Sequence, residues 1–389
     1  MSGRADEARA IGEHAIQRLE PFGETPELAS ALRRLGAFYW RSGESALADA
    51  ALRRAADIAA RIGELDVRSA ALQYLGINLG QSGHAHESIA FLEESFELAK
   101  RGNDANNLQR LYNNFASSLA DFGSQYERAR EIGLEGLAMA RRGGGSGWTG
   151  WVSGTMSEIY VATGDLAEAE KMARDTLEYA LSSGDAPLTG MRYVVLAWIL
   201  LLRGRLDEAE PLLAEARRYL EGNHEPQLQL GLSEVLADAA MARGDENEAL
   251  AHRRAGAEVA SDYNVEQGGP MMLDLIRSLI NRGELDEARR AREVLGRGEA
   301  PRTRAFAEVG DGLMAEDRND AVRLLREACA SLEEIGVRID LARALLDLGR
   351  AERRAGIDGR PSFERARELL VACDARLFLP QVEAELVGD

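Results

Sequence analysis

Apolar residues recur along the chain at three- and four-residue spacing, between short breaks that are polar or contain glycine. Leu206, Ala209, Leu212, Leu213 and Ala216 are one example. This spacing places apolar side chains on one face of an α-helix. No stretch keeps the alternation of apolar and polar residues that a half-buried β-strand requires. The sequence therefore predicts an all-α protein.

The breaks between the helical segments have a fixed period. Glycines end successive segments about every 40 residues, at Gly43, Gly83, Gly123, Gly164, Gly204, Gly244 and Gly283. A second series of glycines lies between and beyond them, at Gly63, Gly102, Gly143, Gly184, Gly222, Gly296 and Gly336. Self-similarity at this period indicates stacked structural repeats. Each repeat is predicted to be a helix A, a short turn, a helix B and another short turn.

The residues after each glycine of the first series also repeat, as in Gly164-Asp-Leu-Ala-Glu-Ala-Glu170 and Gly204-Arg-Leu-Asp-Glu-Ala-Glu210. We expect the glycine to adopt the left-handed conformation that ends helix A. The acidic residues are expected to cap helix B and to complement its dipole. A small residue follows five positions after the glycine, at Ala48, Ser88, Ala169, Ala209, Ala249 and Ala288. A small side chain there allows the two helices of a pair to pack closely.

These signals predict one repeat array over residues 1–389, a right-handed superhelical solenoid of about nine helical hairpins. Its parts are a partial N-terminal repeat (1–22), regular repeats (23–283), degenerate repeats (284–374) and a C-terminal capping helix (375–389) broken near Pro380. The first segment, Asp6 to Leu19, has the pattern of a helix B without its helix A. We therefore expect the array to be a piece of a longer protein.

Charge and composition restrict the partners. The formal net charge is −18, which argues against nucleic acid as a direct partner, because phosphate binding requires a basic surface. The excess of acidic residues falls in the first 280 residues and favours a partner with basic residues. The longest apolar run, Tyr193 to Leu202, is flanked by arginines and is too short for a membrane span of roughly 20 residues. Two cysteines and no apolar leader indicate a cytoplasmic protein without membrane contact.

Gly36 and Gly76, each preceded by Leu, with Tyr39 and Ala48 in register, resemble the tetratricopeptide consensus. Longer stretches, such as RLEPFGETPELASALRRLGAFY, LLRGRLDEAEPLLAEARRYL and EIGVRIDLARALLDLGRAERR, are more specific. They resemble the C-terminal repeat region of large bacterial signal-transduction ATPases, which include LuxR-type transcriptional regulators and class III cyclase proteins. The chain has no G-x-x-x-x-G-K-[ST] phosphate loop, no cyclase core and no basic recognition helix, so no catalytic residue is carried over.

Few residues suggest chemistry of their own. The loop Gly143-Gly-Gly-Ser-Gly147 lacks the lysine of a phosphate loop and is interpreted as a flexible turn between repeats. His84 and His86 lack further metal ligands nearby and are expected at the surface. Cys329 and Cys373 lie on apolar helix faces and are expected in the core. We predict no catalytic, cofactor-binding or metal-binding residue, and no enzymatic activity.

Residues of the A helices that point away from helix B are expected to line the concave face and to bind the partner. The predicted protein-binding residues are Arg33, Trp40, Gln73, Arg110, Asn113, Trp151 and Trp198, and Glu158, Met191, Glu234 and Asp238 share this face. Tryptophan and arginine anchor many interfaces, although packing in the core is an alternative for each tryptophan. We place the partner on the first five repeats. Glu170, expected on the convex face, should tolerate substitution by alanine.

The sequence therefore favours a non-catalytic, protein- or peptide-binding repeat region without a cofactor. The resemblance implies that it serves as the sensor or regulatory arm of a signal-transduction or transcription regulator. The alternative is a free-standing adaptor or scaffold with no attached ATPase or DNA-binding domain. A phosphate loop upstream, or a helix-turn-helix downstream, would decide between the two. Self-association is left open.

Overall fold

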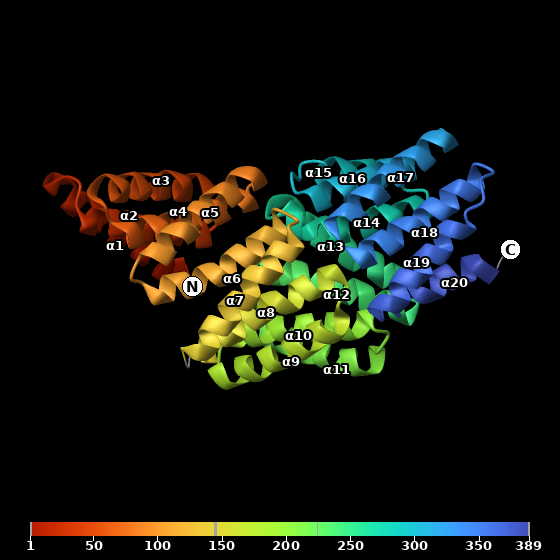
Figure 1. Cartoon of the computed structure of the whole chain (residues 1–389), viewed down its shortest axis with the longest axis horizontal. Helices are drawn as coiled ribbons and strands as arrows, with labels where there is room; N and C mark the ends of the chain where they lie inside the picture. The colour runs from red at the N-terminus through yellow and green to blue at the C-terminus, as the bar shows by residue number, and fades with distance from the viewer. Residues whose placement is uncertain (1, 144–145, 224, 388–389) are drawn as a thin grey trace.

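The computed structural model describes residues 2–143, 146–223 and 225–387 (Figure 1). These residues form twenty α-helices and one short 3-10 helix, and no β-strand occurs among them. The predicted all-α class is confirmed.

The α-helices of the first half are α1 (Ser2–Leu19), α2 (Pro26–Arg41), α3 (Ser45–Ile62), α4 (Leu65–Gln81), α5 (Ala85–Arg101), α6 (Ala105–Asp121), α7 (Tyr126–Arg142), α8 (Ser146–Thr163), α9 (Leu166–Ser183) and α10 (Ala186–Leu202). Those of the second half are α11 (Leu206–Leu220), α12 (Pro226–Arg243), α13 (Glu246–Asp262), α14 (Val265–Asn281), α15 (Leu285–Leu295), α16 (Pro301–Met314), α17 (Arg318–Ile335), α18 (Arg338–Arg354), α19 (Arg360–Cys373) and α20 (Leu379–Val387). The 3-10 helix η1 (Glu20–Phe22) follows α1.

The helices pack as consecutive hairpins. Nine hairpins follow one another in the described residues, from α2 with α3 to α18 with α19, and each even-numbered helix is the helix A of its pair. Helix α1 packs on α2 and helix α20 on α19, at the two ends of the array. The array curves, so that α15–α17 lie across the molecule from α9–α11 (Figure 1). The predicted superhelical solenoid of about nine repeats is confirmed.

The turn glycines adopt the predicted conformation, with one exception. Gly43, Gly83, Gly164, Gly204, Gly244 and Gly283 have φ between 73° and 88°. Between α6 and α7 it is Ser124, with φ of 52°, that is left-handed in place of Gly123. That turn is one residue longer than the turn between α4 and α5, which moves the left-handed position one residue along the chain.

The small residues of helix B lie at the centre of each hairpin, as predicted. Ala48, Ser88, Ala169, Ala209, Ala249 and Ala288 are all 0% exposed. The facing positions on helix A are also constrained, because a Cβ added to Gly36 or Gly76 would lie 2.6 Å from Leu52 or 2.7 Å from Leu92. Close helix packing therefore accounts for the small residues at this register.

The capping prediction holds at only one of these turns. Asp245 accepts a hydrogen bond from the backbone N–H of Glu248, but the helices after Gly164, Gly204 and Gly283 begin without a side-chain cap. Their acidic residues form longer-range contacts instead: Asp165 pairs with Arg338, and Glu284 pairs with Arg254. Side-chain caps occur mainly on A helices, as at Thr25, Asp104 and Asp185.

Two boundary predictions are corrected. Helix α20 begins at Leu379, so residues 375–378 are not helical, and Pro380 lies in its first turn instead of breaking it. Proline fits there because the first N–H groups of a helix have no intrahelical partner. Of the predicted glycine-rich loop, Gly147 belongs to α8, while residues 144 and 145 lie outside the described residues. None of the described helices combines the length and the apolar character that a bilayer span requires.

Candidate functional site

Hairpin turns of the first half of the array contact helix ends of the second half. Gln81 donates to the Tyr263 hydroxyl over 3.1 Å, and the backbone N–H of Arg302 donates to Ser124 Oγ over 3.0 Å. The backbone N–H of Leu377 donates to the Leu202 carbonyl over 3.1 Å. We call this line of contacts, between residues 81–204 and residues 263–377, the seam.

The seam is held by buried and half-buried ion pairs as well. Arg338 at the start of α18 donates to the Thr163 carbonyl over 2.6 Å and pairs with Asp165 over 2.5 Å. Arg203 after α10 pairs with Asp374 over 2.9 Å. Cys373 packs against the turn at Gly164, where an added Cβ would lie 2.5 Å from Sγ. The curved array is therefore closed on itself, and its inner face becomes an interior.

Behind the seam, A helices from α6 to α16 enclose a cavity of about 170 Å³. We call it the acidic cavity. An apolar cavity of roughly 150 Å³ is large enough to hold benzene, so this one has room for the end of a side chain. Its polar and aromatic lining residues are Ser117, Asp121, Tyr126, Thr155, Glu158, Trp198, Gln227, Glu234, Glu266, Gln267, Arg302 and Thr303.

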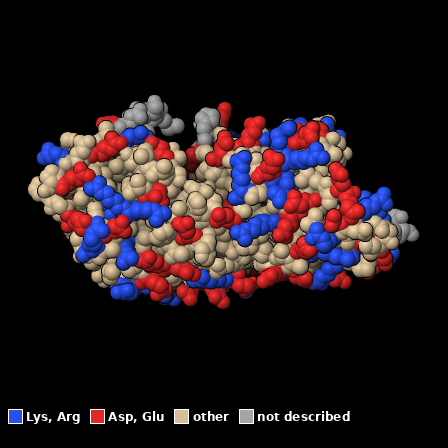
Figure 2. All heavy atoms as spheres, turned by 90° about the horizontal axis from the view of Figure 1, so that it is seen from above, with Lys and Arg blue, Asp and Glu red and all other residues tan. Residues whose placement is uncertain are grey.

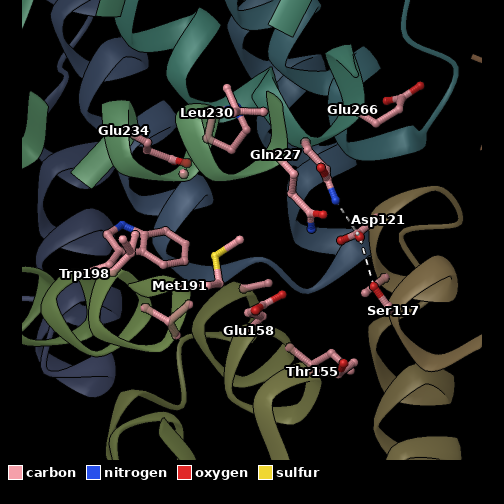
Figure 3. Close-up of a pocket in the computed structure, with 18 of the residues that line it drawn as sticks. Ser117, Asp121, Thr155, Glu158, Met191, Trp198, Gln227, Leu230, Glu234 and Glu266 are labelled. Atoms are coloured by element: carbon pink, nitrogen blue, oxygen red, sulfur yellow. Dashed lines mark hydrogen bonds between the residues drawn. The ribbon is translucent and has the colours of Figure 1, made fainter. Parts of the chain in front are cut away.

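Four carboxylates line the acidic cavity, from four different helices (Figure 3). Asp121 accepts hydrogen bonds from Ser117 over 3.1 Å and from Gln267 over 3.5 Å. Glu158 accepts one from Arg192 over 3.3 Å. Glu266 accepts from the backbone N–H groups of residues 299 and 300. Glu234 forms no ion pair with any described residue, and Arg302, which also lines the cavity, pairs with Asp340.

Enclosure changes the acidity of these groups. Burial raises the pKa of Glu158 to about 7 although Arg192 opposes the shift. Burial and the neighbouring Asp238 raise the pKa of Glu234 to about 8. The Glu158 side chain is 48% exposed and lines the cavity. The carboxylates therefore share a confined space in which a cation would be stabilised.

The remaining wall of the acidic cavity is apolar and aromatic. Trp198 and Met191 on α10 face Leu230 on α12 across the cavity (Figure 3). Asp238 lies near Trp198, and burial raises the pKa of Asp238 to about 6. Carboxylates beside an indole ring suit a guanidinium or ammonium group, because they offer both charge-assisted hydrogen bonds and a cation–π contact.

The predicted binding residues of the first repeats form a connected row on the A helices. The Trp40 ring packs against Tyr74 with centroids 5.5 Å apart, and its Nε1 donates to Gln81 over 2.7 Å. Arg110 lies over the same Tyr74 ring at 5.9 Å and donates to Gln73 over 3.0 Å. Gln73 is buried, and its Nε2 has no partner among the described residues. These side chains therefore hold neighbouring repeats together, and they also line the surface on which we predicted partner binding.

The remaining predicted binding residues, Arg33, Asn113, Trp151 and Trp198, lie outside this row. Arg33 on α2 is half-buried, and burial lowers its pKa. Asn113 accepts a hydrogen bond from Thr155 over 2.9 Å and so joins α6 to α8. Trp151 is 41% exposed and lies 5.8 Å from the Arg192 guanidinium. Trp198 is the one predicted residue that lines the acidic cavity within the described part of the chain.

Sequence reasoning found part of the cavity. Glu158, Met191 and Glu234 were expected on the inner face and do line it. The contributions of Asp121 and of α14 and α16 were missed, because the closure that brings them together leaves no local signal. The one available signal was a set of carboxylates inside otherwise apolar helix A segments, where burial of charge demands a reason.

Glu170 requires a correction. It is 8% exposed and pairs with Arg174 over 2.6 Å, Arg205 over 2.7 Å and also Arg203. These arginines hold the pKa of Glu170 below its usual value, against the opposing effect of burial. Glu170 therefore joins two repeats and does not lie free on the convex face, so we expect its replacement by alanine to lower stability.

The described residues show no metal-ion site, and the face in Figure 2 shows no continuous basic surface. Among the described residues, no group of three or more His, Cys, Asp and Glu side chains is placed to hold a metal ion. Both cysteines are buried, and burial raises the pKa of the Cys329 thiol to about 12. On the face in Figure 2, basic and acidic side chains are interspersed and form no continuous basic stripe.

Comparison with family models gives two matches, both described as tetratricopeptide repeat, at residues 148–222 and 335–353. These two segments therefore match tetratricopeptide repeats in sequence. The first matched segment holds the hairpins α8–α9 and α10–α11, which form one side of the acidic cavity. No curated protein matches the chain.

Solved structures with the same fold extend the likeness over most of the array. A Rap protein complexed with competence and sporulation factor has 13% identity and a TM-score of 0.61, covering 93% of this chain and 99% of that chain. A Rap conjugation gene regulator of plasmid pLS20, in complex with the Phr* peptide, has 14% identity and a TM-score of 0.57, covering 79% and 94%. The apo quorum sensor NprR from B. thuringiensis has 12% identity and a TM-score of 0.52, covering 88% and 97%. A tetratricopeptide-sensor ATPase from Pyrococcus horikoshii reaches 0.46, too low to bear on function.

Proposed function

We propose that this chain is a non-catalytic regulatory module that binds a peptide, or a flexible segment of a protein, inside its superhelix. A basic side chain of the ligand occupies the acidic cavity. The observation that carries the proposal is the cavity itself, in which Glu158 and Glu234 face Trp198 behind a closed seam. A guanidinium there favours the ionised form of Glu234, which has no ion-pair partner among the described residues, and lowers its raised pKa.

The structural relatives support a regulatory role. Two are Rap proteins solved with a small factor or peptide, and one of these is a conjugation gene regulator; a third is a quorum sensor. At this identity the likeness concerns the fold alone, so the role is our proposal. In it, the array is the sensor of a signal-transduction or transcription regulator, and ligand binding changes the contacts across the seam.

We further propose that the ligand extends from the acidic cavity along the A helices of the first repeats. Trp40, Arg110 and Trp151 lie on that path, and all three retain exposed surface. Replacement of Trp40 or Trp151 by alanine should weaken binding by about 2 kcal/mol, as interface anchors do. Far-ultraviolet circular dichroism of each variant should show unchanged helical content.

The primary test is affinity selection. The full chain is immobilised and exposed to two mass-encoded pentapeptide libraries, one with a single arginine and one with citrulline at the same position. Citrulline keeps the shape of arginine and removes the charge. We expect retention of arginine peptides, and a loss of affinity of about 10- to 100-fold in Glu234→Gln or Glu158→Gln, because each removes a charge-assisted hydrogen bond worth roughly 1.5–3 kcal/mol.

Glu178→Gln is the matched control, because Glu178 is an exposed carboxylate on α9 away from the cavity. It should bind as the natural chain does. Equal retention of arginine and citrulline peptides would refute the acidic cavity as the recognition site. Retention of neither library would refute peptide binding.

A further inference from the structure

A second cavity, of about 410 Å³, lies beside the acidic one and has the opposite character. It is lined by α12–α14, α16 and α18–α20, and six of its lining residues are arginines: Arg253, Arg277, Arg282, Arg343, Arg350 and Arg354. We call it the arginine cavity. Helices α12 and α14 contribute to both cavities, so the two share a wall.

Most of these arginines form ion pairs with carboxylates of the same chain. Arg277 pairs with Asp347 over 2.7 Å and with Asp274 over 2.9 Å. Arg350 pairs with Glu385 over 2.6 Å, outside the lining. Arg282 pairs with Glu284 over 3.1 Å. These pairs hold the three guanidiniums against carboxylates of the chain.

Arg253 and Arg343 differ from the others. Arg253 is 8% exposed, its Nη1 donates to Ser278 over 2.6 Å, and the nearest carboxylate oxygen, on Asp274, is 3.9 Å from Nη2. Arg343 bonds Asp274 through Nη2 alone, and its guanidinium stacks 4.3 Å from the Phe378 ring. A guanidinium has five N–H donors. The hydrogen bonds within the described residues therefore leave donors on both groups free to bind an oxyanion.

The rest of the lining is apolar, with Leu250, Ile280, Leu346 and Phe378 among its residues. A planar guanidinium pair beside an apolar wall matches a carboxylate attached to a carbon bearing an aliphatic side chain. That is the chemistry of the last residue of a peptide. Asp274, buried between Arg253, Arg277 and Arg343, has a pKa that these arginines hold well below its usual range, so it competes with the ligand as an anion.

We propose that the arginine cavity binds the C-terminal carboxylate of the peptide whose basic side chain occupies the acidic cavity. The inference rests on the proposed function. Glu234 and Met241, which line the two cavities, are both on α12, and seven residues of helix rise by about 10 Å. An extended chain covers that distance in roughly three residues. An extended peptide of a few residues is therefore long enough to reach both cavities.

The test uses pentapeptides of the arginine library with an apolar last residue, each made as the free acid and as the C-terminal amide. The acid should be retained by the full chain at least tenfold over the amide. Arg343→Met should abolish that difference, and Asp274→Asn should increase acid binding because it frees two guanidinium groups. Arg323→Met, on the exposed face of α17, is the control and should change nothing.

A second measurement separates this inference from peptide binding in general. Saturation-transfer NMR compares N-acetyl-leucine with N-acetyl-leucinamide, which differ only in the carboxylate. We expect a signal for the acid that disappears in Arg343→Met and in Arg253→Gln. If peptides are retained equally as acids and amides, the carboxylate site is refuted while the proposed function stands. If no peptide is retained, the proposed function fails and the NMR comparison alone decides the site: a signal for the acid only supports it, and equal signals refute it.

Discussion

Replacing Glu234 by glutamine should stabilise the chain at alkaline pH and leave its stability unchanged at acidic pH. Glu234 lies in the acidic cavity with Asp238, Asp274 and Asp340 close enough to raise its pKa and Arg302 opposing them. Its pKa is raised from 4.5 to about 8. Glutamine has the shape of the protonated acid, so the variant removes the charge and little else.

The direction of the stability change follows from the linkage between proton binding and folding. A carboxyl whose pKa is higher in the folded state costs nothing while it is protonated in both states, below about pH 4.5. The cost grows as pH rises toward the folded pKa and is complete above it. A rise from 4.5 to about 8 corresponds to an upper limit of about 5 kcal/mol. Because the carboxyl faces a cavity in which solvent and side chains relax, we expect about 1–2 kcal/mol to remain.

The assay is thermal unfolding followed by circular dichroism at pH 5 and pH 9, for the natural chain, Glu234→Gln and the control Glu178→Gln. The midpoint is compared and not an extrapolated free energy, because long repeat arrays depart from two-state unfolding. The Glu234 variant should gain about 2 °C or more at pH 9 and nothing at pH 5. Equal midpoints at both pH values, or a lower midpoint at pH 9, would refute the reasoning that the carboxyl is confined and uncompensated.

Three further predictions concern the scaffold. Ala209→Leu should destabilise the chain by about 1–3 kcal/mol through overpacking of the hairpin centre, whereas Ala186→Leu on an exposed position should be neutral; chemical denaturation compares them. Gly164→Cys should form a disulfide with Cys373 across the seam on mild oxidation, at some cost in stability because residue 164 has a φ of 81°; mass spectrometry detects it, and free thiols in a variant whose circular dichroism matches the natural chain would contradict the seam. Glu170→Ala should lower stability by about 2 kcal/mol because Arg174, Arg203 and Arg205 lose a shared partner, and an unchanged unfolding midpoint would contradict this.

Sequence could predict the hairpins because each is specified locally. A left-handed glycine, a small residue five positions later and apolar residues at helical spacing all act within one 40-residue unit. The exception at Ser124 shows that each turn depends on its own residues, because one added residue moved the left-handed position along the chain. The degenerate repeats after Gly283 still formed α15–α19, because helical spacing survives there without the turn motif.

The seam and the acidic cavity could not be predicted in the same way. The contact between Asp165 and Arg338 depends on curvature summed over several hairpins, and each hairpin adds a small rotation that its own sequence does not reveal. Glu158 and Glu234 could be placed on the inner face by register, but not recognised as neighbours of each other. Glu170 was misplaced for the same reason: its partners Arg203 and Arg205 belong to the next repeat.

The two cavities together suggest why closure and charge occur in the same region. A sequence that folds well usually satisfies every local rule, and the places where it does not are commonly functional. Here the departures are Glu234, a carboxyl group in the acidic cavity with no ion-pair partner among the described residues, and Arg253 and Arg343, guanidiniums with spare donors in the arginine cavity. The ligand that we propose, with a basic side chain and a free carboxylate, would bind both sets at once, and by binding the folded chain alone it would raise the stability of the closed array.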